Sequence, residues 1–243
     1  MDFSLLTYNL MFNRAVRKLE RIFTSYKPDI LCLQEIKTDE ESLKSIERFG
    51  YKPADFSNNI FRFGRVFGVT TFYNPNKFTL TSSENFNLPP SLFERLLFFI
   101  QEGAIPRTVL RTDFIFKKNS KKITLYNIHL SPFATNTIRK RQLLHTFRVL
   151  RLGKKNPIII AGDFNYPYKR KEFESLIGKY NLKEATRNII FTSNFLKIFP
   201  IKLKLDYILY KNLILNDTKR LQIKLSDHYP IISTFAFKQK FKT

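Results

Sequence analysis

Ile158–Asn165 reads Ile-Ile-Ile-Ala-Gly-Asp-Phe-Asn, an apolar run that ends abruptly in polar residues. Such a run is typical of a strand that is buried on both faces. Gly162 ends it, because glycine permits a sharp turn or a close approach of two backbones. If the backbone stays extended, Asp163 and Asn165 share a face, which places a carboxylate and a carboxamide together. The first can accept a proton from water, and the second can donate to an anionic oxygen. Read alone, the stretch also fits a strand that ends in an Asp-capped turn.

The composition describes a globular chain with a large core. Its 243 residues suffice for one large domain or two small ones, and 43% of them are hydrophobic. Because the chain has 26 Phe and no Trp, we expect a core rich in phenylalanine. The single cysteine excludes an internal disulfide and a cysteine zinc cluster. Cys32 lies in an apolar stretch, so we interpret it as inert packing, as expected in a reducing compartment.

The charge is strongly basic. Lysine and arginine number 42 against 20 acidic residues, a formal net charge of +22. This charge favours a polyanion such as nucleic acid, an anionic membrane or a phosphorylated metabolite. A lysine-rich proteome would give the same charge without such a partner. The start Met1-Asp2-Phe3 does not read as a signal peptide, and no apolar run is long enough to span a bilayer. We therefore predict a cytoplasmic monomer without a protein partner.

Periodicity predicts a mixture of strands and helices. Runs of β-forming residues predict strands at Phe3–Leu10, Ile30–Leu33, Tyr51–Phe56, Val66–Tyr73, Phe78–Thr81, Ile105–Lys117, Lys122–Leu130, Ile158–Ala161, Leu205–Tyr210 and Ile231–Phe237. Helical spacing predicts helices from Phe12 to Tyr26, from a Thr38/Glu41 capping box to Phe49, and over Leu88–Gln101, Thr135–Leu152 and Lys169–Tyr180. The mixture indicates an α/β fold with two sheets between helices, in one domain over residues 1–237. A basic tail follows at 238–243.

Polar residues recur where the predicted strands end. They are Asn9, Glu35, His129, Asp163, Asn165, Asp206 and the run Ser226-Asp227-His228. Strand ends are where α/β sheets assemble sites from distant parts of a sequence. Each residue also has a structural interpretation: a turn cap for Asn9, a first exposed residue for Glu35, a core histidine for His129. Asp206 is harder to explain in this way, because a buried carboxylate needs a metal, a histidine or several donors.

Six short motifs together resemble the endonuclease/exonuclease/phosphatase superfamily. In chain order they are Thr7-Tyr8-Asn9-Leu10, Leu33-Gln34-Glu35, Asn127-Ile128-His129-Leu130, Gly162-Asp163-Phe164-Asn165, Leu205-Asp206-Tyr207-Ile208 and Ser226-Asp227-His228-Tyr229-Pro230. The last motif and Gly-Asp-Phe-Asn are the most specific. The resemblance spans nearly the whole chain and implies a four-layer α/β sandwich, two mixed β-sheets flanked by helices. It also implies a site at one end of the two sheets.

The resemblance further implies a divalent-metal phosphoesterase that uses Mg²⁺, with Mn²⁺ as a substitute. Glu35 would be the principal metal ligand, with Asn9 and Asp227 nearby, since hard oxygen ligands suit Mg²⁺. Asp163 would orient or deprotonate the attacking water, and Asn165 would donate to a phosphoryl oxygen.

Two histidines complete the implied catalytic set. His228, oriented by Asp206, would stabilise the charge that develops on the phosphate. His129 would contact a phosphate oxygen or assist the leaving group, and either Glu84 or Glu102 would support it. His129 argues against an abasic-site endonuclease, because such enzymes usually lack a histidine at this position.

The substrate is left open by these residues. We expect a nuclease acting on DNA or RNA, with basic clusters along a phosphate track at the rim of the site. The predicted substrate-binding residues are Arg107, Arg139, Lys169 and Arg170. A lipid or inositol phosphoesterase and a catalytically inactive binding module are the alternatives. The lipid alternative depends on the apolar stretch Leu92–Ile100, which fits either a membrane-dipping helix or one packed against the sandwich.

Overall fold

The computed structural model describes residues 2–62, 64–90, 107–132, 134–149, 156–195, 201–223 and 225–238. Their first sheet has six strands in the order β13-β14-β1-β2-β4-β3. The bounds are β1 Asp2–Asn9, β2 Ile30–Lys37, β3 Lys52–Arg62, β4 Arg65–Tyr73, β13 Leu213–Arg220 and β14 Ile231–Phe237. β1 and β2 run parallel and the other neighbours antiparallel, so the sheet is mixed.

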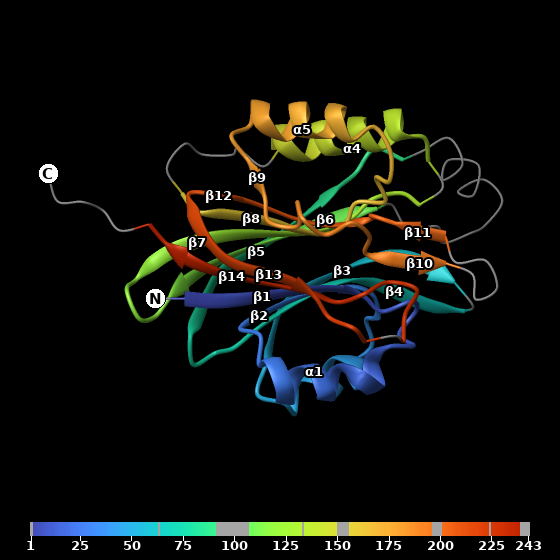
Figure 1. The fold of residues 1–243 in the computed structure, drawn as a ribbon. Coiled ribbons are helices and arrows are strands. Elements are labelled where there is room, and N and C mark those ends of the chain that lie inside the picture. Colours follow the sequence, from blue (N-terminus) through green and yellow to red (C-terminus); the bar gives the residue numbers. More distant parts are fainter. Residues whose placement is uncertain are drawn as a thin grey trace, which may run out of the picture.

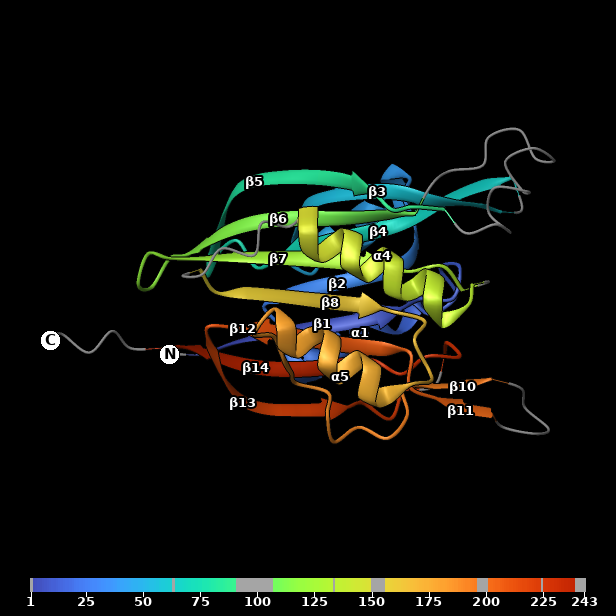
Figure 2. The same cartoon turned by 90° about the horizontal axis from the view of Figure 1, so that it is seen from above.

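The second sheet also has six strands, in the order β5-β6-β7-β8-β12-β9. They are β5 Phe78–Asn87, β6 Thr108–Phe116, β7 Lys121–His129, β8 Ile158–Asp163, β9 Lys183–Glu184 and β12 Asp206–Lys211. β7 and β8 are parallel, which brings their C-terminal ends to the same edge. A separate hairpin joins β10 Ser193–Phe195 to β11 Ile201–Leu203. Figure 2 shows this hairpin at the end of the molecule where β8 finishes.

Helices cover both outer faces. The 3₁₀ turn η1 (Val16–Lys18), α1 (Leu19–Tyr26) and α2 (Glu40–Glu47) belong to the first sheet, and α4 (Asn136–Val149) and α5 (Arg170–Lys179) to the second. Figure 1 shows α1 below the stacked sheets and α4 and α5 above them. The predicted four-layer α/β sandwich is confirmed. None of the helices in the described residues is both long enough and apolar enough to cross a membrane.

Successive side chains of each strand point to opposite faces of the sheet, and this alternation gives the sandwich three hydrophobic cores. In β1, Phe3 and Leu5 face the core between the sheets, whereas Leu6 and Tyr8 face α1. In β8, Ile159 faces the other sheet and its neighbours face α4 and α5. The sheet-to-sheet core contains a cluster of aromatic rings, as the composition predicts: Phe3, Phe78, Phe116, Phe235 and Phe237 lie with ring centroids 5.2–6.1 Å apart.

Gly162 shows why the chain can turn at the end of β8. Its φ is +143°, and a Cβ added there would lie 2.0 Å from the carbonyl oxygen of Ile128 in β7. Any other residue would separate the two strands, so the close approach predicted for Gly162 is confirmed.

Two helix starts are predicted wrongly. The first helix begins at Leu19, not Phe12, because Met11, Phe12 and Asn13 all have positive φ values. The second is capped by Asp39, whose carboxylate accepts a hydrogen bond from the Ser42 amide at 2.9 Å. Thr38 instead donates its hydroxyl to Asn58.

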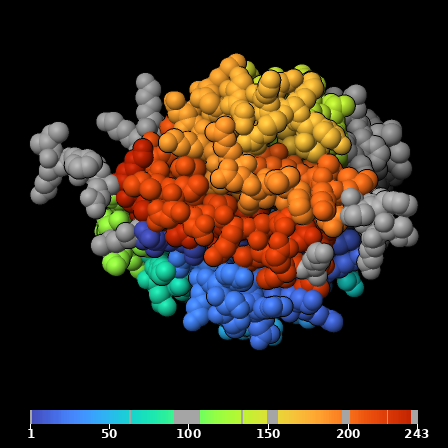
Figure 3. Space-filling model, viewed as in Figure 1, coloured from blue at the N-terminus to red at the C-terminus, as the bar shows by residue number. Residues whose placement is uncertain are grey.

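Other differences between the predicted and observed elements concern the edge strands of the two sheets. The edge strand β13 is not predicted, since its second half, Asn-Asp-Thr-Lys-Arg, is polar. Figure 3 shows the C-terminal segment, in red and orange, forming the surface between the helical layers. β5 extends past Thr81 to Asn87 through exposed polar residues. Most of the predicted helix Leu88–Gln101, including the stretch Leu92–Ile100, lies outside the described residues.

Candidate active site

Strand register brings three polar residues into one row. Asp163 ends β8, pairs with His129 at the end of parallel β7, and pairs with Asp206 at the start of antiparallel β12. Glu35 comes from the other sheet. There β2 carries a bulge between Gln34 and Ile36, and Glu35 has a φ of +53° that turns its side chain toward this row.

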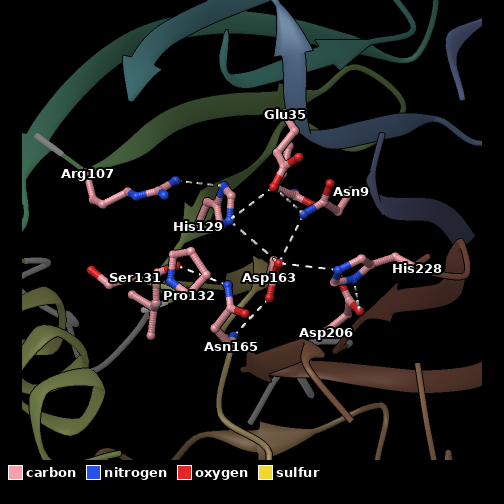
Figure 4. A network of polar contacts seen from close by, with 12 residues as sticks. Asn9, Glu35, Arg107, His129, Ser131, Pro132, Asp163, Asn165, Asp206 and His228 are labelled. Atoms are coloured by element: carbon pink, nitrogen blue, oxygen red, sulfur yellow. Dashed lines mark hydrogen bonds and ion pairs between the residues drawn. The ribbon is translucent and has the colours of Figure 1, made fainter. Parts of the chain in front are cut away.

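Asn9 joins the two sheets at this point (Figure 4). Its amide nitrogen Nδ2 lies 3.0 Å from Oδ2 of Asp163 and 3.2 Å from Oε1 of Glu35. Its oxygen Oδ1 accepts a hydrogen bond from the Met11 amide at 3.0 Å. The side chains that the sequence places at separate strand ends are therefore in direct contact.

The Glu35 carboxylate has been removed from water without a full set of partners. The Phe12 amide donates to Oε2 at 3.1 Å, and Asn9 donates to Oε1. Burial raises the pKa of Glu35, and the Asn9 hydrogen bond and nearby cations offset this in part. A carboxylate in this state gains from a bound cation.

Asp163 lies at the centre of the site. Its Oδ1 accepts from the Asn165 amide at 2.9 Å, and its Oδ2 accepts from Asn9. Burial raises the pKa of Asp163 to about 7, with the charge of His228 lowering it and that of Asp206 raising it. A carboxyl group with a pKa near neutrality can accept a proton and release it again.

His228 and Asp206 form the buried pair that the sequence predicts. The ring nitrogen Nδ1 lies 2.8 Å from Asp206 Oδ2, and Nε2 lies 3.7 Å from Asp163 Oδ2. Burial opposes the charged ring, but Asp206 and Asp163 outweigh it and raise the pKa of His228 to about 10. His228 is therefore a cation with two N–H donors at neutral pH.

His129 is held in the opposite charge state. Burial, followed by the charges of Arg107 and His228, lowers its pKa well below the usual value, so the ring is neutral. Nδ1 lies 3.3 Å from Nη1 of Arg107, which can only donate, so Nδ1 accepts and Nε2 carries the proton. Nε2 faces Asp163 Oδ2 at 3.6 Å and Glu35 Oε1 at 3.8 Å.

Of the two glutamates expected to support His129, only Glu84 lies within the described residues, and it does not contact this ring. Glu84 forms an ion pair with Arg111 instead, at 3.6 Å, and Glu102 lies outside the described residues.

Two groups of ligands in the site suit a divalent cation. One is Glu35 near Asp227, whose charge also acts on the pKa of Glu35. Asn9 lies beside Glu35 but directs Nδ2 to it, so it would bind a cation only through the remaining lone pair of Oδ1. The other offers one ligand atom each from Asp163, Asp206 and His228, all within 4.8 Å of one another. The second group could hold a metal only after the His228 cation lost a proton.

The four predicted substrate-binding residues are placed differently. Arg107 lies in the site beside His129. Arg139 is buried, and its guanidinium binds the chain itself, donating to Ser131 O at 3.0 Å and Pro132 O at 2.6 Å. The Arg139 guanidinium is thus held by backbone carbonyls of the protein.

Two of these residues lie at the start of α5. Arg170 is paired with Glu184 and with Glu174, at 3.0 Å from the latter, and Lys169 with Glu172 at 3.2 Å. The guanidinium of Arg170 is thus bound by two carboxylates of the protein.

The chain matches the model of the Endonuclease/Exonuclease/phosphatase family over residues 6–228. It belongs to this family. The matched region contains every residue of the site, from Asn9 to His228. The resemblance read from the six motifs is confirmed at the level of the family.

Individual relatives of this family are distant. Human 2',5'-phosphodiesterase 12 is 27% identical over 181 residues, which cover 65% of this chain and 29% of that protein. The UPF0294 protein VP2298 of Vibrio parahaemolyticus is 28% identical over 133 residues, 54% of this chain and 46% of that protein. The chain thus matches less than half the length of these curated relatives.

Solved structures of the family share the fold. The catalytic domain of human Nocturnin superposes with a TM-score of 0.75 at 20% identity, covering 98% of this chain and 95% of that one. ANGEL2, a 2',3'-cyclic phosphatase, gives a TM-score of 0.74 at 17% identity, covering 97% and 95%. At these identities the likeness concerns the fold alone.

Proposed function

We propose that this chain is a divalent-metal-dependent phosphodiesterase that acts on nucleic acid. The observation that carries the proposal is the state of Asp163, a buried carboxyl group of near-neutral pKa between a cationic and a neutral histidine. Water bound at Asp163 could lose a proton to it and attack a phosphorus atom. His228, whose Nδ1–H is held by Asp206, would then supply its Nε2–H and a positive charge where negative charge develops.

His129 and Arg107 have a complementary role in this proposal. A neutral imidazole that carries its proton on Nε2 can donate to a phosphate oxygen or to the leaving oxygen. The Arg107 guanidinium beside Nδ1 favours this tautomer and adds a positive charge at the same edge. Asn165 is held with its Nδ2 on Leu130 O at 3.1 Å and would meet a phosphoryl oxygen from the Asp163 side.

The residues present fit a hard divalent cation. The Glu35 carboxylate, with a side chain 13% exposed, has a raised pKa, which a bound cation would offset. We propose Glu35, Asn9 and Asp227 as the residues that would hold Mg²⁺ or Mn²⁺. Such a cation, when bound, would stabilise charge on the phosphoryl oxygens.

Nucleic acid is the favoured substrate for two reasons. The net charge of +22 favours a polyanion, and the relative 2',5'-phosphodiesterase 12, which matches 65% of this chain, is named for a phosphodiester bond. The stretch Leu92–Ile100, on which the lipid alternative depends, lies outside the described residues.

A substrate panel tests the proposal. Purified protein with Mg²⁺ or Mn²⁺ would be assayed on DNA, RNA, 2',5'-linked oligonucleotides, sphingomyelin vesicles and inositol phosphates. Hydrolysis of a nucleic acid, lost in Asp163→Asn, is expected. Hydrolysis of sphingomyelin or inositol phosphate alone would support the lipid or inositol phosphoesterase, and nucleic-acid binding without hydrolysis would support the binding module.

A further inference from the structure

The segment Phe191–Phe195 contacts the backbone near both members of the Asp206–His228 pair. It forms β10 and the two residues before it, and a β-bridge pairs Ser193 with His228. The Asn194 amide donates to Asp227 O at 2.7 Å. This segment therefore supports the loop that carries His228 from one side.

Thr192, within this segment, contacts both sides of the pair. Its hydroxyl oxygen accepts hydrogen bonds from the amides of Leu205 and Asp206, each at 2.9 Å. Its carbonyl oxygen accepts from the Tyr229 amide at 2.7 Å, next to His228. Thr192 is completely buried, and the two amide bonds use both acceptor lone pairs of its hydroxyl.

Asp206 depends on these backbone contacts for its position. Within the described residues, its carboxylate has one hydrogen bond, from Oδ2 to His228, and the other oxygen has none. Other polar side chains therefore do not orient this carboxylate. Its place is set by the backbone at the start of β12, where the Thr192 hydroxyl holds two successive amides.

Arg220 of β13 contacts the residues next to Thr192 and His228. Its guanidinium carbon lies 3.9 Å from the ring centroid of Phe191 and 4.5 Å from that of Tyr229, and Nη1 donates to Phe191 O at 3.2 Å. These two rings belong to the neighbours of Thr192 and His228. The backbone around Thr192 and His228 is thus held by Arg220 as well as by the hydrogen bonds of Thr192.

We propose that Thr192 is a positioning residue that sets the alignment of Asp206 with His228. The proposal rests on the proposed function for its kinetic consequence, but its geometric part concerns the free protein. Thr192 acts through the backbone of Asp206 and the loop of His228. No contact between Thr192 and the substrate is required.

The test compares three variants. Thr192→Val keeps the shape and removes the acceptor, Thr192→Ser keeps the acceptor, and Thr146→Val is a matched control. Thr146 is equally buried in α4, where its hydroxyl donates to Gln142 O at 2.8 Å, away from the site. The readouts are melting temperature, kcat and KM on the panel substrate, and the NMR resonance of the His228 Nδ1–H. With three histidines in the chain, His228→Gln assigns that resonance.

Thr192→Val is expected to shift or abolish the Nδ1–H resonance and to lower kcat about 10–100-fold with KM little changed, because misalignment affects the reacting geometry. Thr192→Ser should restore both readouts to within about threefold in kcat. Thr146→Val should lower the melting temperature while the resonance and kcat remain as in the wild type.

A folded Thr192→Val protein with the wild-type resonance and kcat would overturn the proposal. If that variant does not fold, Thr192→Cys, whose sulfur is a weak acceptor, takes its place with the same expectation and the same overturning result. The resonance is read without substrate. A wild-type protein that hydrolyses nothing would contradict the proposed function, and the resonance would still decide the role of Thr192.

Discussion

Glu184 and Asp163 are two carboxylates of the second sheet whose side chains are buried. Glu184 lies in the edge strand β9 and Asp163 in the inner strand β8, and the two differ in their partners. Glu184 meets two cations, the Arg170 guanidinium and the Lys204 ammonium at 2.8 Å, and accepts from the Thr186 hydroxyl at 2.9 Å. Asp163 shares one cationic ring, His228, with a second carboxylate, Asp206.

The two pKa values move in opposite directions as a result. Burial raises the pKa of Glu184, but Arg170 and Lys204 outweigh it and lower the pKa below its ordinary value. The pKa of Asp163 is raised to about 7. A carboxylate that is fully paired serves the fold, whereas one left short of positive charge is available for chemistry.

The largest effect is expected at Asp163. Asp163→Asn keeps the shape of the side chain but cannot accept a proton, so turnover should fall by roughly 10²–10⁴-fold at any Mg²⁺ concentration. The melting temperature should change little, because the substitution also removes a carboxylate whose burial disfavours its charged form. Measured kcat and thermal unfolding check this. Retained turnover would assign the base to another residue.

Glu184→Gln should have the converse effect. The Lys204 ammonium, with a side chain 12% exposed, and the Arg170 guanidinium, 36% exposed, lose a shared counter-charge, so the free energy of unfolding should fall by about 1.5–3 kcal/mol, while kcat of the folded fraction is retained. Because folding lowers the pKa of Glu184, its stabilisation is present above the ordinary glutamate pKa and is lost as pH falls through the lowered value. Urea unfolding at several pH values measures this. A Glu184→Gln variant that loses kcat but keeps its stability would contradict a structural role for Glu184.

Asp206 and His228 should behave as one unit. We expect Asp206→Asn to cost nearly as much activity as His228→Ala, and the double variant to cost little more, because the 2.8 Å contact makes each residue act through the other. Kinetics of the three variants form the cycle. Losses that add on a logarithmic scale would show that the two residues act separately.

Glu35→Gln should weaken metal binding without removing the base. We expect a lower affinity for Mn²⁺, by about 10–100-fold, and partial recovery of the rate at high Mg²⁺. Calorimetric titration of Mn²⁺ gives the affinity without reference to activity. A loss of rate that high Mg²⁺ leaves unchanged, with Mn²⁺ affinity intact, would assign Glu35 another role.

The smallest effect concerns the basic rim. Nucleic-acid affinity should fall with salt, roughly 10-fold per doubling if several phosphates are contacted. Lys169→Glu combined with Lys171→Glu should weaken binding modestly and to the same extent for every nucleic-acid sequence, because phosphate contacts do not read bases. Arg170 is excluded from this test, because its reversal would disrupt the Glu184 cluster. Fluorescence anisotropy at several salt concentrations measures both. Salt-independent binding would contradict a phosphate track.

The sequence predicts the strand ends well because buried strands leave a clear apolar pattern. Asp163, His129 and Asp206 each follow or begin such a run, and parallel and antiparallel register then brings them together. The cost of burying a lone carboxylate predicts some partner for Asp206, and the family resemblance is what points to His228.

Other features depend on three-dimensional contacts that no local pattern records. The left-handed turn at Met11–Asn13 looks helical by apolar spacing, yet its amides are directed to Asn9 and Glu35. The roles of Arg139 and Arg170 could not be separated from substrate binding, since basic residues near motif strands look alike until their carbonyl and carboxylate partners are known.

The hydrogen bond from Asn9 to Asp163 has a consequence for how the molecule forms. It spans 154 positions along the chain and joins one sheet to the other. Contacts of this sequence separation form late, because the entropy of closing so long a loop must be overcome before they stabilise anything. The site draws on both ends of the chain, from Asn9 in β1 to His228 just before β14. It is therefore complete only when β14 has paired with β1.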